Sequence, residues 1–307
     1  MNEQKALGKR KKGTLKRLEE ELEQDPVWQE EFEGVNVQPE FQSIEGRLKM
    51  TDEKVEQAKS ILRAISGTES YLVYAVANAI RVRTKEGAVF NLNVEGDDFD
   101  RTVKVTDVAA SGVYIAACTD SGHLHFCKFD ASGLIKLPQT TKRNEPISYV
   151  AFGPDMFAFA YNKKYFVTRW GGVIPNFCPL KTTEEKICGI DYDSEGRLAL
   201  AFPDSIEIGE SGKKLKIEIE PENPFEGVGI RSISFSPDNK YMAVVNRPNE
   251  SPGGLRVYEL DYENLTSRLV DKSGPIVYAG YYFGVHWDND KIITCAGEKV
   301  QTWKFEK

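Results

Sequence analysis

The sequence predicts an all-β fold, a β-propeller of six blades, with seven blades as the alternative. Short segments that alternate apolar and polar residues recur along the chain, separated by turns rich in Gly, Pro, Asn and Asp. This is the pattern of consecutive antiparallel hairpins. Equivalent positions recur at intervals of about 40 to 52 residues, close to the length of a four-stranded propeller blade. Six such units fit between about residue 58 and residue 307.

The clearest unit spans residues 230–260. An alternating strand runs into the turn Pro237-Asp238-Asn239, a second apolar strand follows, and a third alternates again after a Gly-containing loop. The positions matched between units are Val108, Phe152, Tyr192, Phe235 and Trp287. Because strand side chains alternate between two faces, the same pattern predicts which residues are nearly fully buried between blades. These are Phe152, Ile190, Tyr192, Ile233, Phe235 and Ala243.

Residues 230–260 resemble a WD40 repeat, whose usual form is an I-x-S-V-x-F-S-P-D-G run followed by a strand that ends in Trp-Asp. Tyr258-Glu259 stands where that dipeptide would be, and Trp303-Lys304 stands there in the last unit. The Gly-His dipeptide typical of the family's repeat start is not found at the start of any unit, so the family's His-Asp hydrogen-bond network is not carried over. The resemblance covers about 250 residues as a pattern and implies a WD40-like propeller.

The last unit ends at Phe305 after three strands, and an unclosed propeller would expose a sheet edge. The resemblance implies that the missing strand comes from the N-terminal side, where residues 44–50 alternate suitably. We therefore expect residues 44–50 to pair with residues 300–305. The predicted domains are a charged, partly helical extension over residues 1–43 and the propeller over residues 44–307.

Strong charge is concentrated in the extension. Residues 1–17 carry a net charge of +6 and residues 18–45 a net charge of −10, whereas the rest of the chain sums to −3. Charged blocks of this kind usually act as interaction tails. The basic run Lys9, Arg10, Lys11 and Lys12 indicates nuclear localisation or contact with nucleic acid, and a solubilising tail is the alternative.

Apolar side chains within the extension indicate partner binding. Three leucines at helical spacing predict a short amphipathic helix over residues 14–24, and two aromatic residues follow among acidic ones. The aromatic pair either docks on a partner or pins the extension to its own propeller. Two loops between strands add an aromatic and a basic contact residue. The candidate partner-binding residues are Leu15, Leu18, Leu22, Trp28, Phe32, Phe99 and Arg247.

Catalytic and metal-binding motifs are absent from the sequence, which contains no P-loop, dinucleotide fingerprint or HExxH. His123, His125 and Cys127 alternate on one strand and could form half of a metal site, but packing between blades explains them better. The five cysteines lie in or beside apolar runs, which indicates buried, reduced thiols. We therefore expect no catalytic residues, no metal and no cofactor.

The predicted function is a non-enzymatic protein-interaction scaffold, a subunit of a larger assembly whose other subunits are its partners. No run of about 18 apolar residues and no secretory signal occurs, so we expect an intracellular protein, nuclear or cytoplasmic, without a membrane partner. The basic run favours the nucleus. One alternative is an RNA-associated factor that uses the basic tail. Another is a propeller hydrolase or lyase, which would require inward carboxylates and a metal in the central channel.

Overall fold

The protein is described here from a computed structural model. The structure describes residues 48–50, 62–76, 78–94, 103–171, 180–209, 213–221, 229–246, 254–273, 283–296 and 299–306. All of them belong to the unit Phe41–Lys307. They form strands and turns, with no helix among the described residues.

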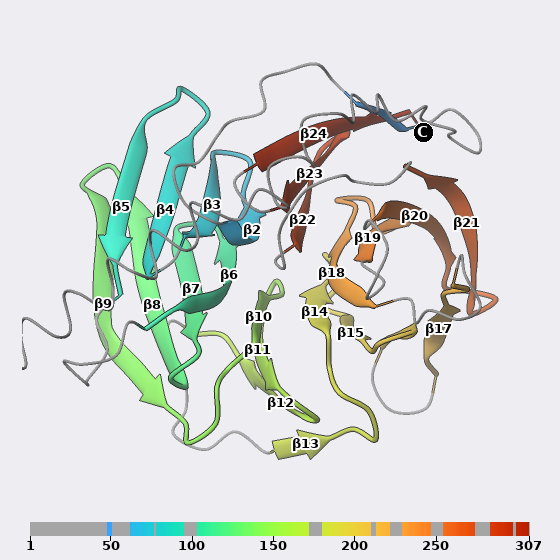
Figure 1. The fold of residues 1–307 in the computed structure, drawn as a ribbon, viewed down its shortest axis with the longest axis horizontal. Coiled ribbons are helices and arrows are strands. Elements are labelled where there is room, and N and C mark those ends of the chain that lie inside the picture. Colours follow the sequence, from blue (N-terminus) through green and yellow to red (C-terminus); the bar gives the residue numbers. More distant parts are fainter. Residues whose placement is uncertain are drawn as a thin grey trace, which may run out of the picture. The chain divides into compact units, whose positions relative to one another are not determined.

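The strands form six four-stranded antiparallel sheets, arranged as the blades of a propeller (Figure 1). In each of the first five blades, chain order is also the order from the innermost to the outermost strand. Blade 1 consists of β2 (Leu62–Gly67), β3 (Tyr71–Val76), β4 (Ala79–Thr84) and β5 (Val89–Asn93). Blade 2 consists of β6 (Val105–Ser111), β7 (Tyr114–Thr119), β8 (His123–Asp130) and β9 (Gly133–Lys142).

The next three blades repeat this meander. Blade 3 consists of β10 (Tyr149–Phe152), β11 (Met156–Tyr161), β12 (Lys164–Arg169) and β13 (Leu180–Thr182). Blade 4 consists of β14 (Gly189–Tyr192), β15 (Leu198–Ala201), β16 (Ser205–Ile208) and β17 (Leu215–Glu218). Blade 5 consists of β18 (Ile230–Phe235), β19 (Tyr241–Asn246), β20 (Gly254–Asp261) and β21 (Thr266–Lys272).

Blade 6 combines strands from both ends of the described chain. Its order is β22 (Phe283–Asp288), β23 (Lys291–Ala296), β24 (Lys299–Phe305) and β1 (Leu48–Met50). The closing strand pairs antiparallel with β24, with Leu48 opposite Phe305 and Met50 opposite Trp303. The predicted closure is therefore confirmed over residues 48–50, and residues 44–47 lie outside the described residues.

The turn between β18 and β19 shows how the sequence sets a hairpin. Asn239 adopts a left-handed conformation with φ of 59°, which asparagine tolerates better than most residues. The Ser236 hydroxyl donates to Asp238 Oδ1 at 2.7 Å and accepts the Tyr241 backbone N–H at 2.9 Å. The predicted Pro-Asp-Asn turn is confirmed, and it fixes the register in which Phe235 pairs with Met242.

Apolar side chains pack between neighbouring blades in six clusters, one for each junction of the ring. At the junction of blades 4 and 5, for example, Phe235 and Met242 pack with Ile206 and Ile217. Each blade therefore buries both faces, and its stability depends on its two neighbours.

Burial of the predicted core residues is confirmed with one exception. Ile190, Tyr192, Ile233, Phe235 and Ala243 are buried, but Phe152 is only partly buried. Phe152 is the last residue of β10, and its ring contacts Trp170 and Phe157 beside the turn, where the packing between blades ends.

The cysteines of the described residues are unpaired thiols. Cys118, Cys127 and Cys295 are buried, whereas Cys188 is half-buried, so the expectation of burial is wrong for Cys188. This residue lies just before β14, at the start of the blade rather than within a strand. Cys178 lies outside the described residues. Among the described residues, no helix is long and apolar enough to span a membrane.

Candidate functional site

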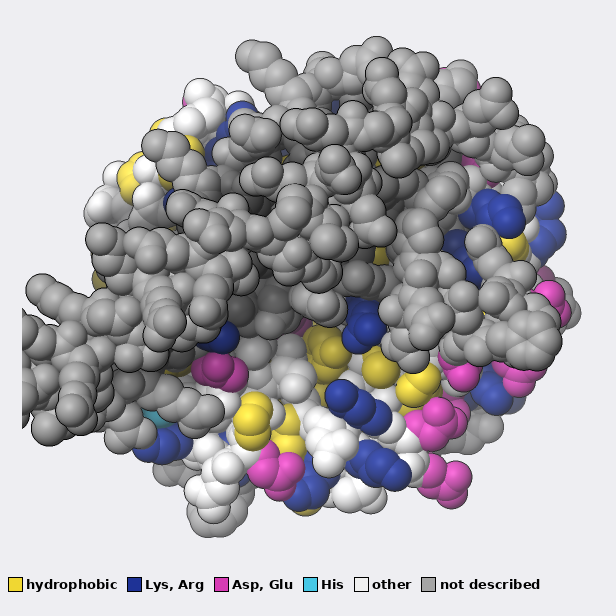
Figure 2. All heavy atoms as spheres, viewed as in Figure 1, with side chains coloured by type: hydrophobic (Ala, Val, Ile, Leu, Met, Phe, Trp, Pro, Cys, Tyr) yellow, Lys and Arg dark blue, Asp and Glu magenta, His cyan; other side chains and the backbone are white. Residues whose placement is uncertain are grey.

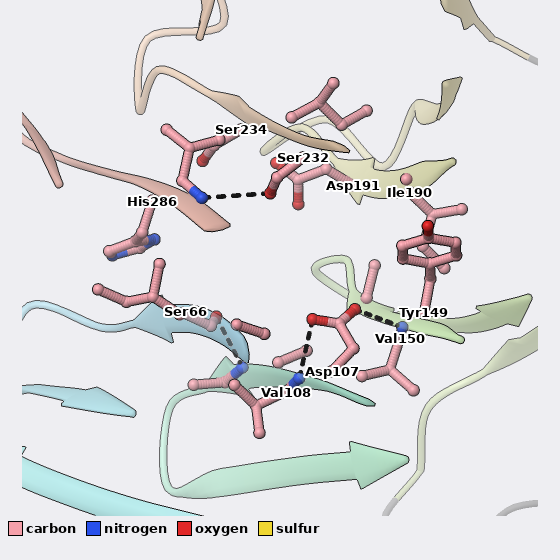
Figure 3. A pocket seen from close by; sticks show the side chains of 18 of the residues that line it. Ser66, Asp107, Val108, Tyr149, Val150, Ile190, Asp191, Ser232, Ser234 and His286 are labelled. Carbon is pink, nitrogen blue, oxygen red and sulfur yellow. Dashed lines mark hydrogen bonds between the residues drawn. The ribbon is translucent and has the colours of Figure 1, made fainter. Parts of the chain in front are cut away.

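The innermost strands of all six blades surround a central cavity with a volume of about 290 Å³ (Figure 3). Its wall is more polar than the clusters between blades. Carboxyl, hydroxyl, imidazole and guanidinium groups come to it from different blades, through Asp107, Tyr149, Asp191, Arg231 and His286 together with several serines. A concave site with convergent polar groups is the default place to look for chemistry in a protein of this kind.

The carboxyl groups of the cavity wall bind backbone groups of the next blade. Asp107 on β6 accepts the N–H of its neighbour Val108 and the N–H of Val150 on β10, each at 2.9 Å. Asp191 on β14 does the same with Tyr192 and with Phe235 on β18, again at 2.9 Å. Each carboxyl group accepts one hydrogen bond on each oxygen. One bond stays within its own strand and the other crosses to the next blade.

Serine hydroxyls play the same part at other junctions. Ser66 Oγ accepts the N–H of Ala110 from blade 2 at 3.1 Å. Ser232 and Ser234 accept the N–H groups of Val285 and Trp287 from blade 6 at 3.2 and 3.1 Å. Side chains of the innermost strands thus hold the next blade at four of the six junctions in the described part of the ring. In three blades, the N–H of the repeated position donates to a side chain of the preceding blade: Ala110 to Ser66, Phe235 to Asp191 and Trp287 to Ser234. The blade 2 residue equivalent to Phe235 and Trp287 is therefore Ala110, and the assignment of Val108 to this position is wrong.

Burial changes the ionisation of the two carboxyl groups. Desolvation raises the pKa of Asp107 and that of Asp191 to about 7, although the backbone hydrogen bonds oppose the rise. A charge on Asp191 raises the pKa of Asp107 further, because both groups face the same cavity. Near neutral pH, each carboxyl group is therefore divided between its neutral and charged forms.

Two other polar groups of the wall have no hydrogen-bond partner among the described residues. Burial raises the pKa of the Tyr149 hydroxyl and lowers the pKa of His286 to about 4, so that the imidazole is neutral. The Nε2 atom of His286 lies close to Gly67 of blade 1, where a Cβ atom would come within 2.8 Å of it. Only glycine fits opposite this ring.

The cavity wall offers carboxyl, hydroxyl, imidazole and guanidinium groups for hydrogen bonding. Among the described residues, no group of three or more His, Cys, Asp and Glu side chains could hold a metal ion. The two carboxyl groups use both oxygens to hold backbone N–H groups, which limits their movement toward a substrate.

A second hollow lies beside the β10–β11 turn of blade 3 and the β14–β15 turn of blade 4. It measures about 560 Å³ and is lined by the half-buried Trp170, by Met156 and by the charged residues Asp155, Arg169 and Glu195. The Trp170 ring is held from below by Phe126, Phe152 and Phe157 at centroid distances of 5.0 to 5.8 Å. An aromatic ring fixed in this way at a surface is a common kind of interface anchor.

The sequence-predicted partner-binding residues all lie outside the described residues. This holds for Leu15, Leu18, Leu22, Trp28, Phe32, Phe99 and Arg247 and for the basic run Lys9, Arg10, Lys11 and Lys12. Their roles stay predictions.

The histidines of blade 2 are packed within the protein. His123 and His125 are buried and their rings stack at a centroid distance of 5.8 Å, with the Ser121 hydroxyl 2.9 Å from His123 Nδ1. Cys127 belongs to the apolar cluster between blades 1 and 2.

Sequence reasoning missed Asp107 and Asp191. Each aspartate lies inside the otherwise apolar first strand of a unit. Because aspartate is uncommon in strands, this position could have indicated a specific role.

Comparison with known proteins supports the architecture. No family model matches the chain, and no curated protein matches its sequence. A chain of the solved structure titled "Crystal Structure of Mitotic Checkpoint Complex" superposes with a TM-score of 0.62 at 13% sequence identity, covering 86% of this chain and 94% of that one. The protein has the fold of a six-bladed β-propeller, similar to that of the matched chain.

A second solved structure, titled "KlHsv2 with loop 6CD replaced by a Gly-Ser linker", matches with a TM-score of 0.48 at 14% identity over 76% of each chain. At this level of similarity the first comparison establishes the propeller fold alone, and function has to be argued from the sites.

Proposed function

We propose that this WD40-type propeller is a non-enzymatic protein-interaction scaffold, a subunit of a larger intracellular assembly. The observation that carries the proposal is the use of the channel carboxylates. Asp107 and Asp191 are the groups that a hydrolase or lyase site would need, yet both hold backbone N–H groups of neighbouring blades. Their geometry supports a rigid ring more directly than it supports catalysis.

The surface is consistent with protein partners. On the face shown in Figure 2, the described side chains mix hydrophobic, basic and acidic groups without a continuous basic region. A nucleic-acid-binding face would concentrate Lys and Arg over one folded surface. A propeller chain of the same fold belongs to a structure whose title names a multi-protein complex, which supports the same reading by analogy.

The extension supplies the second part of the proposal. Its aromatic residues Trp28 and Phe32 and its leucines give it apolar anchors, and its blocks of opposite charge give it long-range attraction to charged partners. We propose that this segment contacts another subunit and that the basic run Lys9 to Lys12 directs the protein to the nucleus.

Affinity purification with mass spectrometry tests the scaffold. The full chain is compared with a variant lacking residues 1–33, which keeps the closing strand β1, and with a variant in which Lys9, Arg10, Lys11 and Lys12 are replaced by glutamine. Loss of the same set of proteins from the truncated chain alone supports protein recognition by the extension. Loss from both variants, reproduced by nuclease treatment of the wild-type sample, identifies an RNA-associated factor instead and overturns the proposal.

A further inference from the structure

The cavity wall carries charges of both signs. Asp107 and Asp191 lie on facing walls, on β6 and β14 (Figure 3). Arg231, near the start of β18, also lines the cavity and is exposed to solvent. Tyr149 lines the same cavity. The cavity therefore joins an enclosed acidic part to a basic group that is open to water.

Several polar atoms of the wall retain unused hydrogen-bonding capacity. Each carboxyl oxygen of Asp107 and Asp191 accepts one backbone N–H and has a second lone pair available. The Tyr149 hydroxyl and the His286 ring are half-buried at the cavity wall and have no partner among the described residues. Polar groups that line a cavity without a protein partner are available to bind a ligand or water.

We propose that the central channel binds a small zwitterion of the free amino acid type, with its ammonium group at Asp107 and Asp191 and its carboxylate toward Arg231 and the Tyr149 hydroxyl. The volume of about 290 Å³ accommodates a molecule of this size. An ammonium group offers three N–H donors to the free lone pairs of the two carboxylates, and the ligand carboxylate accepts from Arg231 and Tyr149.

The two charges of the wall exclude simpler ligands. A simple amine would leave Arg231 without an anion and would bring a second cation into the same cavity. A simple carboxylate would place its charge beside two acidic groups, and like charges in an enclosed site repel strongly. A zwitterion satisfies both ends of the site at once.

Binding of the ammonium group should also release protons. Because the pKa of each carboxyl group is raised to about 7, part of each group is protonated at neutral pH, and a bound cation favours the ionised form. The ligand should therefore bind more tightly at pH 8 than at pH 6. The groups that act on these carboxyls are the backbone N–H groups described above, Asp191 in the case of Asp107, and Asp193 in the case of Asp191.

The experiment uses the full chain and measures its melting temperature and its heats of binding. The probes are L-alanine, L-lysine and γ-aminobutyrate as zwitterions, with methylamine and acetate as the two separate halves, each at about 10 mM. At least one zwitterion should raise the melting temperature while methylamine and acetate leave it unchanged. Titration at neutral pH in two buffers of different ionisation enthalpy should show proton release.

Variants separate the two ends of the site. Arg231→Gln should weaken binding of the active zwitterion about tenfold or more without loss of folding, because the side chain is exposed. Asp191→Asn should weaken it as much and reduce the proton release. Lys186→Gln is the matched control, an exposed basic residue that does not line the cavity, and it should leave binding unchanged.

Three results would overturn the inference. The first is the absence of any melting-temperature change with all the zwitterions. The second is equal binding by the wild-type chain and Arg231→Gln, and the third is equal stabilisation by methylamine alone. Either of the last two would remove the carboxylate end of the site.

Discussion

Replacing Asp191 by alanine removes one acceptor group from two backbone N–H bonds, one within blade 4 and one to Phe235 of blade 5. The shorter side chain should fit, because Ala151 of blade 3 occupies the corresponding position of its strand. The variant therefore isolates the hydrogen bonds and the charge of one carboxyl group from any change of packing.

The expected magnitude depends on pH. Each buried donor left without its acceptor costs about 1–2 kcal/mol, so the substitution should lower the free energy of unfolding by about 2–4 kcal/mol at pH 5. The pKa of Asp191 is about 7 in the folded protein and near 3.8 when the chain unfolds. The folded state therefore binds more protons between these values, and wild-type stability falls as pH rises through this window. Between pH 5 and pH 8 the loss from this group is about 2–3 kcal/mol.

Because alanine does not titrate, the variant lacks this loss. The difference between wild type and Asp191→Ala should then shrink from about 2–4 kcal/mol at pH 5 to about 1 kcal/mol or less at pH 8. Urea unfolding at the two pH values measures it. Ser234→Ala is the control, since it removes one acceptor of the same kind without a titrating group. A destabilisation by Asp191→Ala that is the same at both pH values would refute the assigned pKa and the reasoning from it.

Three further predictions concern closure, core and recognition. Deleting residues 1–50 should leave the outer edge of β24 unpaired and lower the free energy of unfolding by about 2–3 kcal/mol, with reduced solubility; an unchanged melting temperature would contradict it. Phe235→Ala should cost about 3–5 kcal/mol in urea unfolding, because the ring is buried between blades 4 and 5, and a cost below about 1 kcal/mol would show that this cluster is not tightly packed. Trp28→Ala combined with Phe32→Ala should reduce recovery of partner proteins without changing the melting temperature, whereas a lower melting temperature with partners retained would identify a structural clasp.

The strands of the blades could be predicted from local sequence, because apolar and polar residues alternate along each of them. Phe235 and Ile233 are buried as the alternation predicts, and the Pro237-Asp238-Asn239 turn forms where its residues favour it. The closing strand was also predictable. The last unit lacked a fourth strand, and the only alternating segment not yet assigned to a blade lay just before the first unit. These features depend on residues that are neighbours in sequence or on a simple count of strands.

The contacts between blades were not predictable in the same way. Spacing alone assigned Val108 to the repeated position, but the equivalent residue is Ala110, whose N–H donates to Ser66 as that of Trp287 donates to Ser234. This equivalence depends on a hydrogen bond between two blades, which the spacing of apolar residues does not report. The roles of Asp107 and Asp191 depend on bonds to residues 43 and 44 positions away, which no local pattern reports.

The composition of blade 6 has a consequence for how the protein is made. Blades 1 to 5 each draw four successive strands from the chain, so each can pair as soon as its segment leaves the ribosome. Blade 6 instead joins β1, which precedes every other described strand, to β24, which follows them all. Until β24 has been synthesised, β1 has no partner strand and the facing sides of blades 1 and 5 lack their cover. The nascent chain therefore carries an open ring through most of its synthesis, and ring closure is the last step of its folding.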